Sequence, residues 1–275
     1  MNQRECILGW KGVKIMGDLQ SKKMKIFFVG DSFTSPYLGK SEMYYDVINK
    51  NIDIELFVYG GGGYGTLQEY LVINKYVDEI KPDLIILQAC SNDFINNDWN
   101  LEKRSFVHNN YTIRPYYEKG TIVYRFPRGP FFREFITYSR LAYFLIRRYD
   151  IILARLNNIG YLNTVEKYIG AEGLNFIEFK RSVDTTSELI GMIKKRCGKI
   201  PIVAFSVFED EPYFSQFKDI FRKHNINFLE NIPELAWARE DRKWRKNNEH
   251  WTKKGHAACG EYLTEYIKIN FLINR

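Results

Sequence analysis

Short apolar runs alternate with amphipathic stretches in the first third of the chain. Continuous apolar runs predict strands at Lys25–Val29, Ile54–Tyr59 and Leu84–Gln88. Apolar positions at helical spacing predict helices around Lys40–Lys50 and over Leu67–Ile80. This strand–helix–strand–helix–strand order within about 65 residues is typical of a parallel sheet with right-handed crossovers.

The same alternation returns after residue 180. The pattern predicts, in chain order, a helix that Gly198 ends, a strand, a helix, a strand and a final helix: Val183–Arg196, Ile200–Phe205, Tyr213–His224, Ile226–Leu229 and Lys254–Ile269. We therefore predict one doubly wound α/β domain over residues 24–275, with residues 1–23 as an extension of unknown role.

Residues 94–170 do not follow this rhythm, and we predict that they form an inserted, lid-like subdomain after the third strand. A hairpin is indicated by two strand-like runs, Tyr111–Tyr117 and Thr121–Phe126, around a turn that contains Gly120. A basic, aromatic helix is predicted at Phe131–Arg148.

Composition places the chain among globular proteins. It has 275 residues, of which 45% are hydrophobic and 27% charged, and no apolar run approaches the roughly 18 residues of a membrane-spanning helix. Its four cysteines lie far apart without a CxxC pair, which argues against a zinc site or a disulfide framework. Residues 1–23 lack a continuous apolar segment, so we expect a cytoplasmic location.

The net charge of +7 is concentrated in one segment. Residues 94–170 hold 12 Lys+Arg against 6 Asp+Glu, a difference of +6, together with 17 of the 44 aromatic residues. This pattern fits a satellite core with a solvated basic face, or a lid whose rings and arginines contact a glycan or another anionic substrate. Nucleic acid is a less favoured partner, because no nucleic-acid-binding module is visible. The amphipathic stretch Phe131–Arg148 leaves peripheral contact with an anionic membrane as a further possibility.

Three predicted strands end in polar or glycine-rich sequence, which favours a site at the carboxyl edge of the sheet. These ends are Gly30–Ser32, Gly60–Gly65 and Ser91–Asp93. The glycine run lacks the Lys-Ser/Thr ending of a phosphate-binding loop, and it is no dinucleotide fingerprint, so we expect no cofactor. Ser32 is either a turn serine or an exposed nucleophile. His250, in the polar loop before the last helix, can reach it, and Ser with His is the minimum for acyl transfer.

These segments resemble the conserved blocks of the SGNH (GDSL-type) hydrolases. Gly30-Asp31-Ser32-Phe33-Thr34 is similar to the first block, Gly63 to the second-block glycine, Asn92-Asp93 to the third block and His250 to the fifth-block histidine. The four blocks occur in family order over about residues 24–270. The resemblance implies a three-layer α/β/α sandwich with a flavodoxin-like parallel sheet.

The resemblance also implies roles for individual residues. Ser32 is the expected nucleophile and His250 its base, while the N–H groups of Ser32 and Gly63 and the amide of Asn92 form the expected oxyanion hole. No metal is implied. We further expect substrate contacts from four residues near the blocks and in the basic segment: Asp31, Arg114, Arg125 and Arg128.

Two positions depart from the family pattern. Asn248 and Asn247 stand where an aspartate usually orients the histidine, and Cys90 replaces a third-block glycine. We take Asn248 as the expected orienting residue; the alternative is a Ser–His dyad that a backbone carbonyl or Glu249 orients. The resulting hypothesis is a serine esterase that deacetylates a carbohydrate through an acyl-Ser32 intermediate. The alternatives are an O-acyltransferase that uses a glycan acceptor, and a catalytically weakened glycan-binding protein.

Overall fold

A computed structural model describes residues 13–15, 17–38, 42–108, 113–126, 139–158, 164–242 and 250–272. These residues form a six-stranded sheet in the order β1-β3-β2-β4-β7-β8. The pairs from β3 to β8 are parallel, and β1 is antiparallel to β3. The strands are β1 (Val13–Ile15), β2 (Lys25–Gly30), β3 (Glu55–Gly60), β4 (Leu84–Ala89), β7 (Ile202–Ser206) and β8 (Asn227–Phe228).

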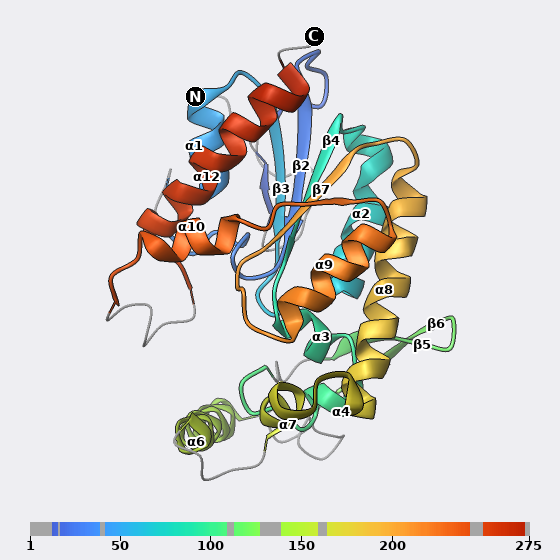
Figure 1. Cartoon of the computed structure of the whole chain (residues 1–275), viewed down its shortest axis with the longest axis vertical. Coiled ribbons are helices and arrows are strands. Elements are labelled where there is room, and N and C mark those ends of the chain that lie inside the picture. The colour runs from blue at the N-terminus through green and yellow to red at the C-terminus, as the bar shows by residue number, and fades with distance from the viewer. Residues whose placement is uncertain are drawn as a thin grey trace.

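Helices cover both faces of this sheet, so the predicted three-layer α/β/α fold is confirmed (Figure 1). The order of the parallel strands is the flavodoxin-like order. One face carries α2 (Thr66–Ile80), α8 (Ile177–Cys197) and α9 (Tyr213–Lys223). The other carries α1 (Tyr44–Asn51), α10 (Ile232–Ala238) and α12 (Lys253–Ile267), which η2 (Lys268–Leu272) continues.

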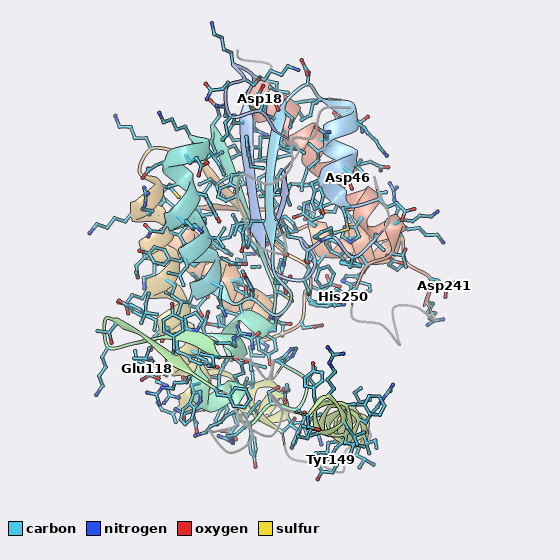
Figure 2. The ribbon with its side chains drawn as sticks, turned by 180° about the vertical axis from the view of Figure 1, so that it is seen from behind. Asp18, Asp46, Glu118, Tyr149, Asp241 and His250 are labelled. Carbon is cyan, nitrogen blue, oxygen red and sulfur yellow. The ribbon has the colours of Figure 1, made fainter. Side chains whose placement is uncertain are left out.

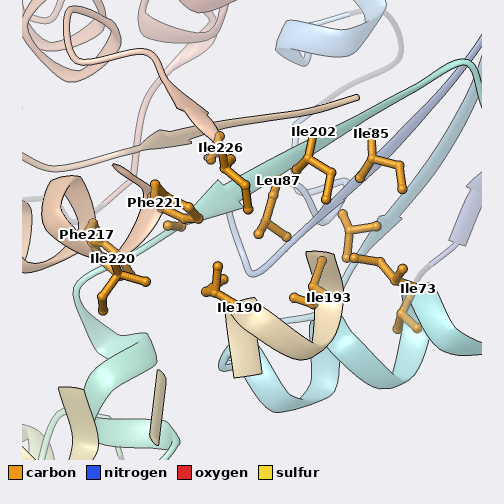
Figure 3. Packing of buried hydrophobic residues seen from close by; sticks show 14 of the residues in the cluster. Ile73, Ile85, Leu87, Ile190, Ile193, Ile202, Phe217, Ile220, Phe221 and Ile226 are labelled. Carbon is orange, nitrogen blue, oxygen red and sulfur yellow. The ribbon is translucent and has the colours of Figure 1, made fainter. Parts of the chain in front are cut away.

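Alternation along the strands builds two cores. On β2, Phe27 and Val29 belong to the core under α2, α8 and α9, whereas Ile26 and Phe28 belong to the core under α1, α10 and α12. Figure 3 shows the first of these cores, with strand residues such as Leu87 packed against isoleucines of the helices. Both faces are apolar, which explains why these strands appear in the sequence as continuous apolar runs.

The chain between β4 and α8 gathers beyond the carboxyl ends of the strands (Figure 1). Its described elements are α3 (Asn92–Asn96), α4 (Trp99–Glu102), the hairpin β5 (Arg114–Glu118) and β6 (Thr121–Arg125), α6 (Arg140–Asn158), α7 (Val165–Glu172) and η1 (Gly173–Asn175). The hairpin forms around the predicted turn. A lid function for this region stays a prediction.

Several predicted boundaries are wrong. The helix predicted around Lys40–Lys50 spans Tyr44–Asn51, and residues 40 and 41 lie outside the described residues. The helix predicted to end at Arg148 continues to Asn158, while the first part of that prediction, residues 131–138, lies outside the described residues. The N-terminal extension, for which the sequence indicated no role, supplies β1.

Candidate active site

The turn after β2 presents Ser32 at the carboxyl edge of the sheet. Asp31 shapes this turn, because its carboxylate accepts a hydrogen bond from the backbone N–H of Phe33 (2.9 Å). Gln88, at the end of β4, braces the turn: its Oε1 accepts from the Asp31 N–H (3.1 Å) and from the Thr34 hydroxyl (2.9 Å). The serine therefore stands on a loop that two neighbouring strands hold in place.

Glycines at the ends of β2 and β3 leave room for the residues that follow Ser32. A Cβ on Gly30 would lie 2.4 Å from the Thr34 Oγ1, and a Cβ on Gly60 would lie 2.2 Å from the Ser35 nitrogen. The Gly61 N–H donates to the Gly30 carbonyl (3.2 Å). This contact brings the second glycine-rich segment against the serine turn.

His250 reaches Ser32 from the loop before α12. Its Nε2 lies 2.8 Å from the Ser32 Oγ, across 218 residues of sequence. The imidazole stacks on the Phe33 ring, with centroids 4.6 Å apart, and the Tyr37 ring meets it edge-on at 5.2 Å. Figure 2 shows His250 at the end of the sheet where the strands terminate. The pair is placed for proton transfer between nucleophile and base.

A buried carboxylate anchors the chain just after His250. Glu240 accepts hydrogen bonds from the Thr252 N–H (2.6 Å), the Thr252 hydroxyl (2.9 Å) and the Gly255 N–H (3.0 Å). These bonds fix the first turn of α12 two residues beyond the histidine. The sequence analysis missed Glu240, since the chain shows no pattern that links this glutamate to the start of the next helix.

Gly63 lies on the loop between β3 and α2. Its φ is +67°, in the left-handed region that favours glycine. The Tyr64 N–H donates to the Gly61 carbonyl (3.0 Å), which closes a turn around it. The Arg114 Nη1, from the hairpin, donates to the Gly63 carbonyl (2.5 Å). The loop is therefore held from within and from the region between β4 and α8.

Arg114 positions the glycine loop in this structure, and the expectation that it contacts substrate stays a prediction. Its side chain is only 5% exposed, and its Nε lies 3.3 Å from the Glu102 Oε2. The Tyr116 hydroxyl donates to the same Glu102 oxygen (3.0 Å). A buried cation next to a buried carboxylate is held in one geometry, so Arg114 gives the Gly63 carbonyl a fixed partner.

Asn92 also holds the glycine loop. Its Nδ2 donates to the Tyr64 carbonyl (3.2 Å) and to the Asn96 Oδ1 (2.9 Å). The Asn96 Nδ2 donates in turn to the His108 carbonyl (2.9 Å). Both N–H groups of the Asn92 amide thus have protein acceptors. To serve as an oxyanion donor, Asn92 must give up one of these two hydrogen bonds and donate that N–H to the substrate.

The other residues predicted to contact substrate are Asp31, Arg125 and Arg128. Asp31 is 1% exposed and shapes the serine turn, and its expected contact with substrate stays a prediction; burial raises the pKa of its carboxyl. Arg125 pairs with Glu118 (2.5 Å) and lies over the Trp99 ring. Arg128 lies outside the described residues, as do Asn247 and the predicted orienting residue, Asn248.

Two further carboxyl groups are buried near the site: Asp93, which follows Asn92 at the end of the third predicted strand, and Glu69, which no sequence pattern indicated. Burial raises the pKa of Glu69 and of Asp93 well above their ordinary values, and the charge of Asp31 adds to both shifts. Asp93 accepts a hydrogen bond from the Cys90 N–H (3.1 Å) and so holds the third-block turn. Within the described ranges, no group of three or more His, Cys, Asp or Glu could hold a metal ion. Likewise, no described helix is long and apolar enough to cross a membrane.

Comparisons with known proteins give matches among solved structures alone. No protein-family model and no curated protein matches the chain. A lipase/acylhydrolase from Enterococcus faecalis is 13% identical with a TM-score of 0.46, over 89% of this chain and 95% of that one. A family 3 carbohydrate esterase from Clostridium thermocellum is 15% identical with a TM-score of 0.47, over 92% and 98%. A catalytic mutant of an acetylxylan esterase from Geobacillus stearothermophilus is 12% identical with a TM-score of 0.47, over 90% and 94%.

Proposed function

We propose that this protein is a serine hydrolase of the SGNH type that cleaves an ester through an acyl-Ser32 intermediate. The observation that carries the proposal is the 2.8 Å contact between the His250 Nε2 and the Ser32 Oγ. It is supported by the meeting of the serine turn with the glycine loop and by Asn92, which bonds to that loop. A nucleophile, a base and backbone N–H donors at one sheet edge are the parts that acyl transfer needs.

The reaction follows from these positions. The Ser32 Oγ attacks the ester carbonyl carbon while the His250 Nε2 takes the hydroxyl proton. The oxyanion accepts hydrogen bonds from the N–H groups of Ser32 and Gly63, each typically worth about 3 kcal/mol of transition-state stabilisation. When the carbon–oxygen bond to the alcohol breaks, His250 returns the proton to the departing oxygen. Water then repeats the attack on the acyl-serine and releases the acid and the free Ser32 hydroxyl.

For the substrate we propose an acetylated carbohydrate. The support is the region between β4 and α8, which stands over the same edge of the sheet (Figure 1). Residues 94–170 hold 17 aromatic residues and an excess of six positive charges. Aromatic faces pack on the apolar faces of sugar rings, and arginine and lysine pair with their anionic substituents.

The test is the Ser32→Ala variant, with Ser35→Ala as the matched control in the same loop. We expect Ser32→Ala to lower p-nitrophenyl acetate hydrolysis by at least about 10³-fold, because the nucleophile is lost. Intact-mass analysis after fluorophosphonate treatment should show one adduct on the wild type and on Ser35→Ala, and none on Ser32→Ala. Hydrolysis that survives in a folded Ser32→Ala protein would refute the proposal.

A further inference from the structure

A cavity of about 460 Å³ lies between α2 and the β5–β6 hairpin. Gly62 and Tyr64, the neighbours of Gly63 in the sequence, belong to its wall. It is therefore adjacent to the loop whose N–H is assigned to the oxyanion. The side chains that decide its chemistry are four tyrosines and two cations: Tyr59, Tyr64, Tyr76, Tyr124, Lys75 and Arg114.

We propose that this cavity is a glycan subsite that binds a carboxylate-bearing sugar, a uronic acid, next to the sugar whose ester meets Ser32. The expected binding of the sugar depends only on the residues that line the cavity. The expected effect of this binding on ester hydrolysis rests on the proposed function.

The aromatic wall has the form that a sugar ring requires. The Tyr59 ring centroid lies 6.2 Å from that of Tyr64 and 6.0 Å from that of Tyr76, with the ring planes inclined by 31° and 32°. Tyr124 adds a ring from β6 that is 67% exposed. Tyr59 and Tyr76 are each 3% exposed and back the wall from the core, while Tyr64 and Tyr124 present the accessible ring surface on which a sugar packs.

The charge of the wall selects for an anion. The Lys75 Nζ lies 4.8 Å from the centroid of the Tyr76 ring, so the ammonium stands next to an aromatic face. Glu102 already balances the charge of Arg114, so Lys75 supplies the attraction for an anion, and none of the described wall residues is a carboxylate. A sugar carboxylate that enters here gains attraction without facing a like charge from the wall.

Arg114 joins the cavity to the reaction. The same guanidinium that lines the cavity donates to the Gly63 carbonyl, and it is held by Glu102. A sugar in the cavity therefore contacts the residue that positions the oxyanion loop. The subsite is placed to orient the glycan while its neighbouring acetyl group reaches the nucleophile.

Binding and catalysis are tested separately. Calorimetric titration of the full-length Ser32→Ala protein with oligogalacturonide and with neutral xylo-oligosaccharide measures the subsite without turnover. We expect oligogalacturonide to bind about threefold more tightly or better at low salt, with the preference shrinking as NaCl is added. Tyr124→Ala should weaken binding of both glycans by about fivefold to tenfold. Lys75→Gln should remove the preference for the acidic glycan.

The control is Ile269→Ala, which removes a side chain of similar exposure, 58%, from η2, outside both the cavity and the region between β4 and α8. With acetylated oligogalacturonide as substrate, Tyr124→Ala should raise KM with little change in kcat, and Ile269→Ala should change neither. Equal affinities for both glycans, or affinities that Tyr124→Ala does not alter, would overturn the subsite. The subsite would also be overturned if the wild type hydrolysed esters of longer acyl chains faster than acetyl esters and Tyr124→Ala abolished that preference. The cavity would then bind the acyl chain. Saturable glycan binding by a protein that hydrolyses no ester would instead leave the subsite in place and defeat the proposed hydrolase.

Discussion

The two halves of the candidate site stand at the ends of adjacent strands but are held by different interactions. On the serine side, His250 lies between aromatic rings, with Phe33 stacked on one face and Tyr37 at its edge. On the glycine side, Gly63 is held by a buried guanidinium, which pairs with Glu102. Ring packing is short-ranged and independent of charge, whereas a buried ion pair depends on both partners keeping their charge. The two halves should therefore respond to different perturbations.

The largest effect is expected on the glycine side. Glu102→Gln leaves the buried Arg114 charge without its counter-charge, and we expect the free energy of unfolding to fall by about 3–5 kcal/mol in urea titration. The matched control is Glu118→Gln on the hairpin that carries Arg114, because Glu118 and Arg125 form an exposed pair, each 39% accessible. That control should cost less than about 1 kcal/mol. Equal losses in the two variants would contradict the distinction drawn here.

The next largest effect is a dependence of stability on pH that comes from His256, which lies next to the serine half of the site. The Tyr44 N–H donates to the His256 Nδ1 (3.3 Å), and the Tyr37 hydroxyl contacts the His256 Nε2. A proton on the His256 Nδ1 would point at the Tyr44 N–H and break this hydrogen bond. Burial lowers the pKa of His256 to about 3, and the nearby charge of His250 adds to the shift.

Because the unfolded chain binds this proton near pH 6.5 and the folded chain does not, stability is lost as pH falls below about 6.5. We expect His256 to account for about 2 kcal/mol of lost stability between pH 7 and pH 5. Urea titrations at the two pH values measure it, with His256→Gln as the reference that lacks the titrating group. An identical pH dependence in the variant would sink the prediction.

The smallest effect should separate ring packing at the site from ring packing in the core. Phe33→Leu removes the stacked partner of His250, and Phe221→Leu removes a ring stacked on Phe228 in the core under α9 (centroids 5.3 Å apart). Each should lower stability by about 1 kcal/mol. Phe33→Leu alone should also lower kcat/KM for p-nitrophenyl acetate, by about threefold to tenfold. Equal activities in the two variants would show that packing does not orient the histidine.

The sheet could be predicted from the sequence, whereas the polar supports of the site could not. The strands are apolar on both faces, so each appears as a run that a glycine, proline or polar turn ends. Short elements such as α10 and β1 escaped, because a seven-residue helix and a three-residue strand leave too few positions for a period.

At the site, the resemblance indicated that Ser32 and His250 belong together, and the structure places them in contact. Asp31 and Arg114 were expected to contact substrate, and no sequence pattern indicated that both side chains are buried. Their burial arises from contacts with Phe33 and Glu102 that no local pattern encodes. Tertiary packing, which places an arginine of the hairpin on a carbonyl 51 residues away, is the information that the sequence pattern lacks.

The strand at the start of the described chain has a consequence for self-association. A parallel sheet that ended at β3 would present a six-residue strand whose free N–H and C=O groups could template another chain. β1 pairs with Phe57, Val58 and Tyr59 in the opposite direction and is only three residues long. At the other margin, β8 is two residues long. Both margins of the described sheet thus end in strands too short to recruit a further copy. Loss of β1 should therefore lower the solubility of the protein before it lowers its activity.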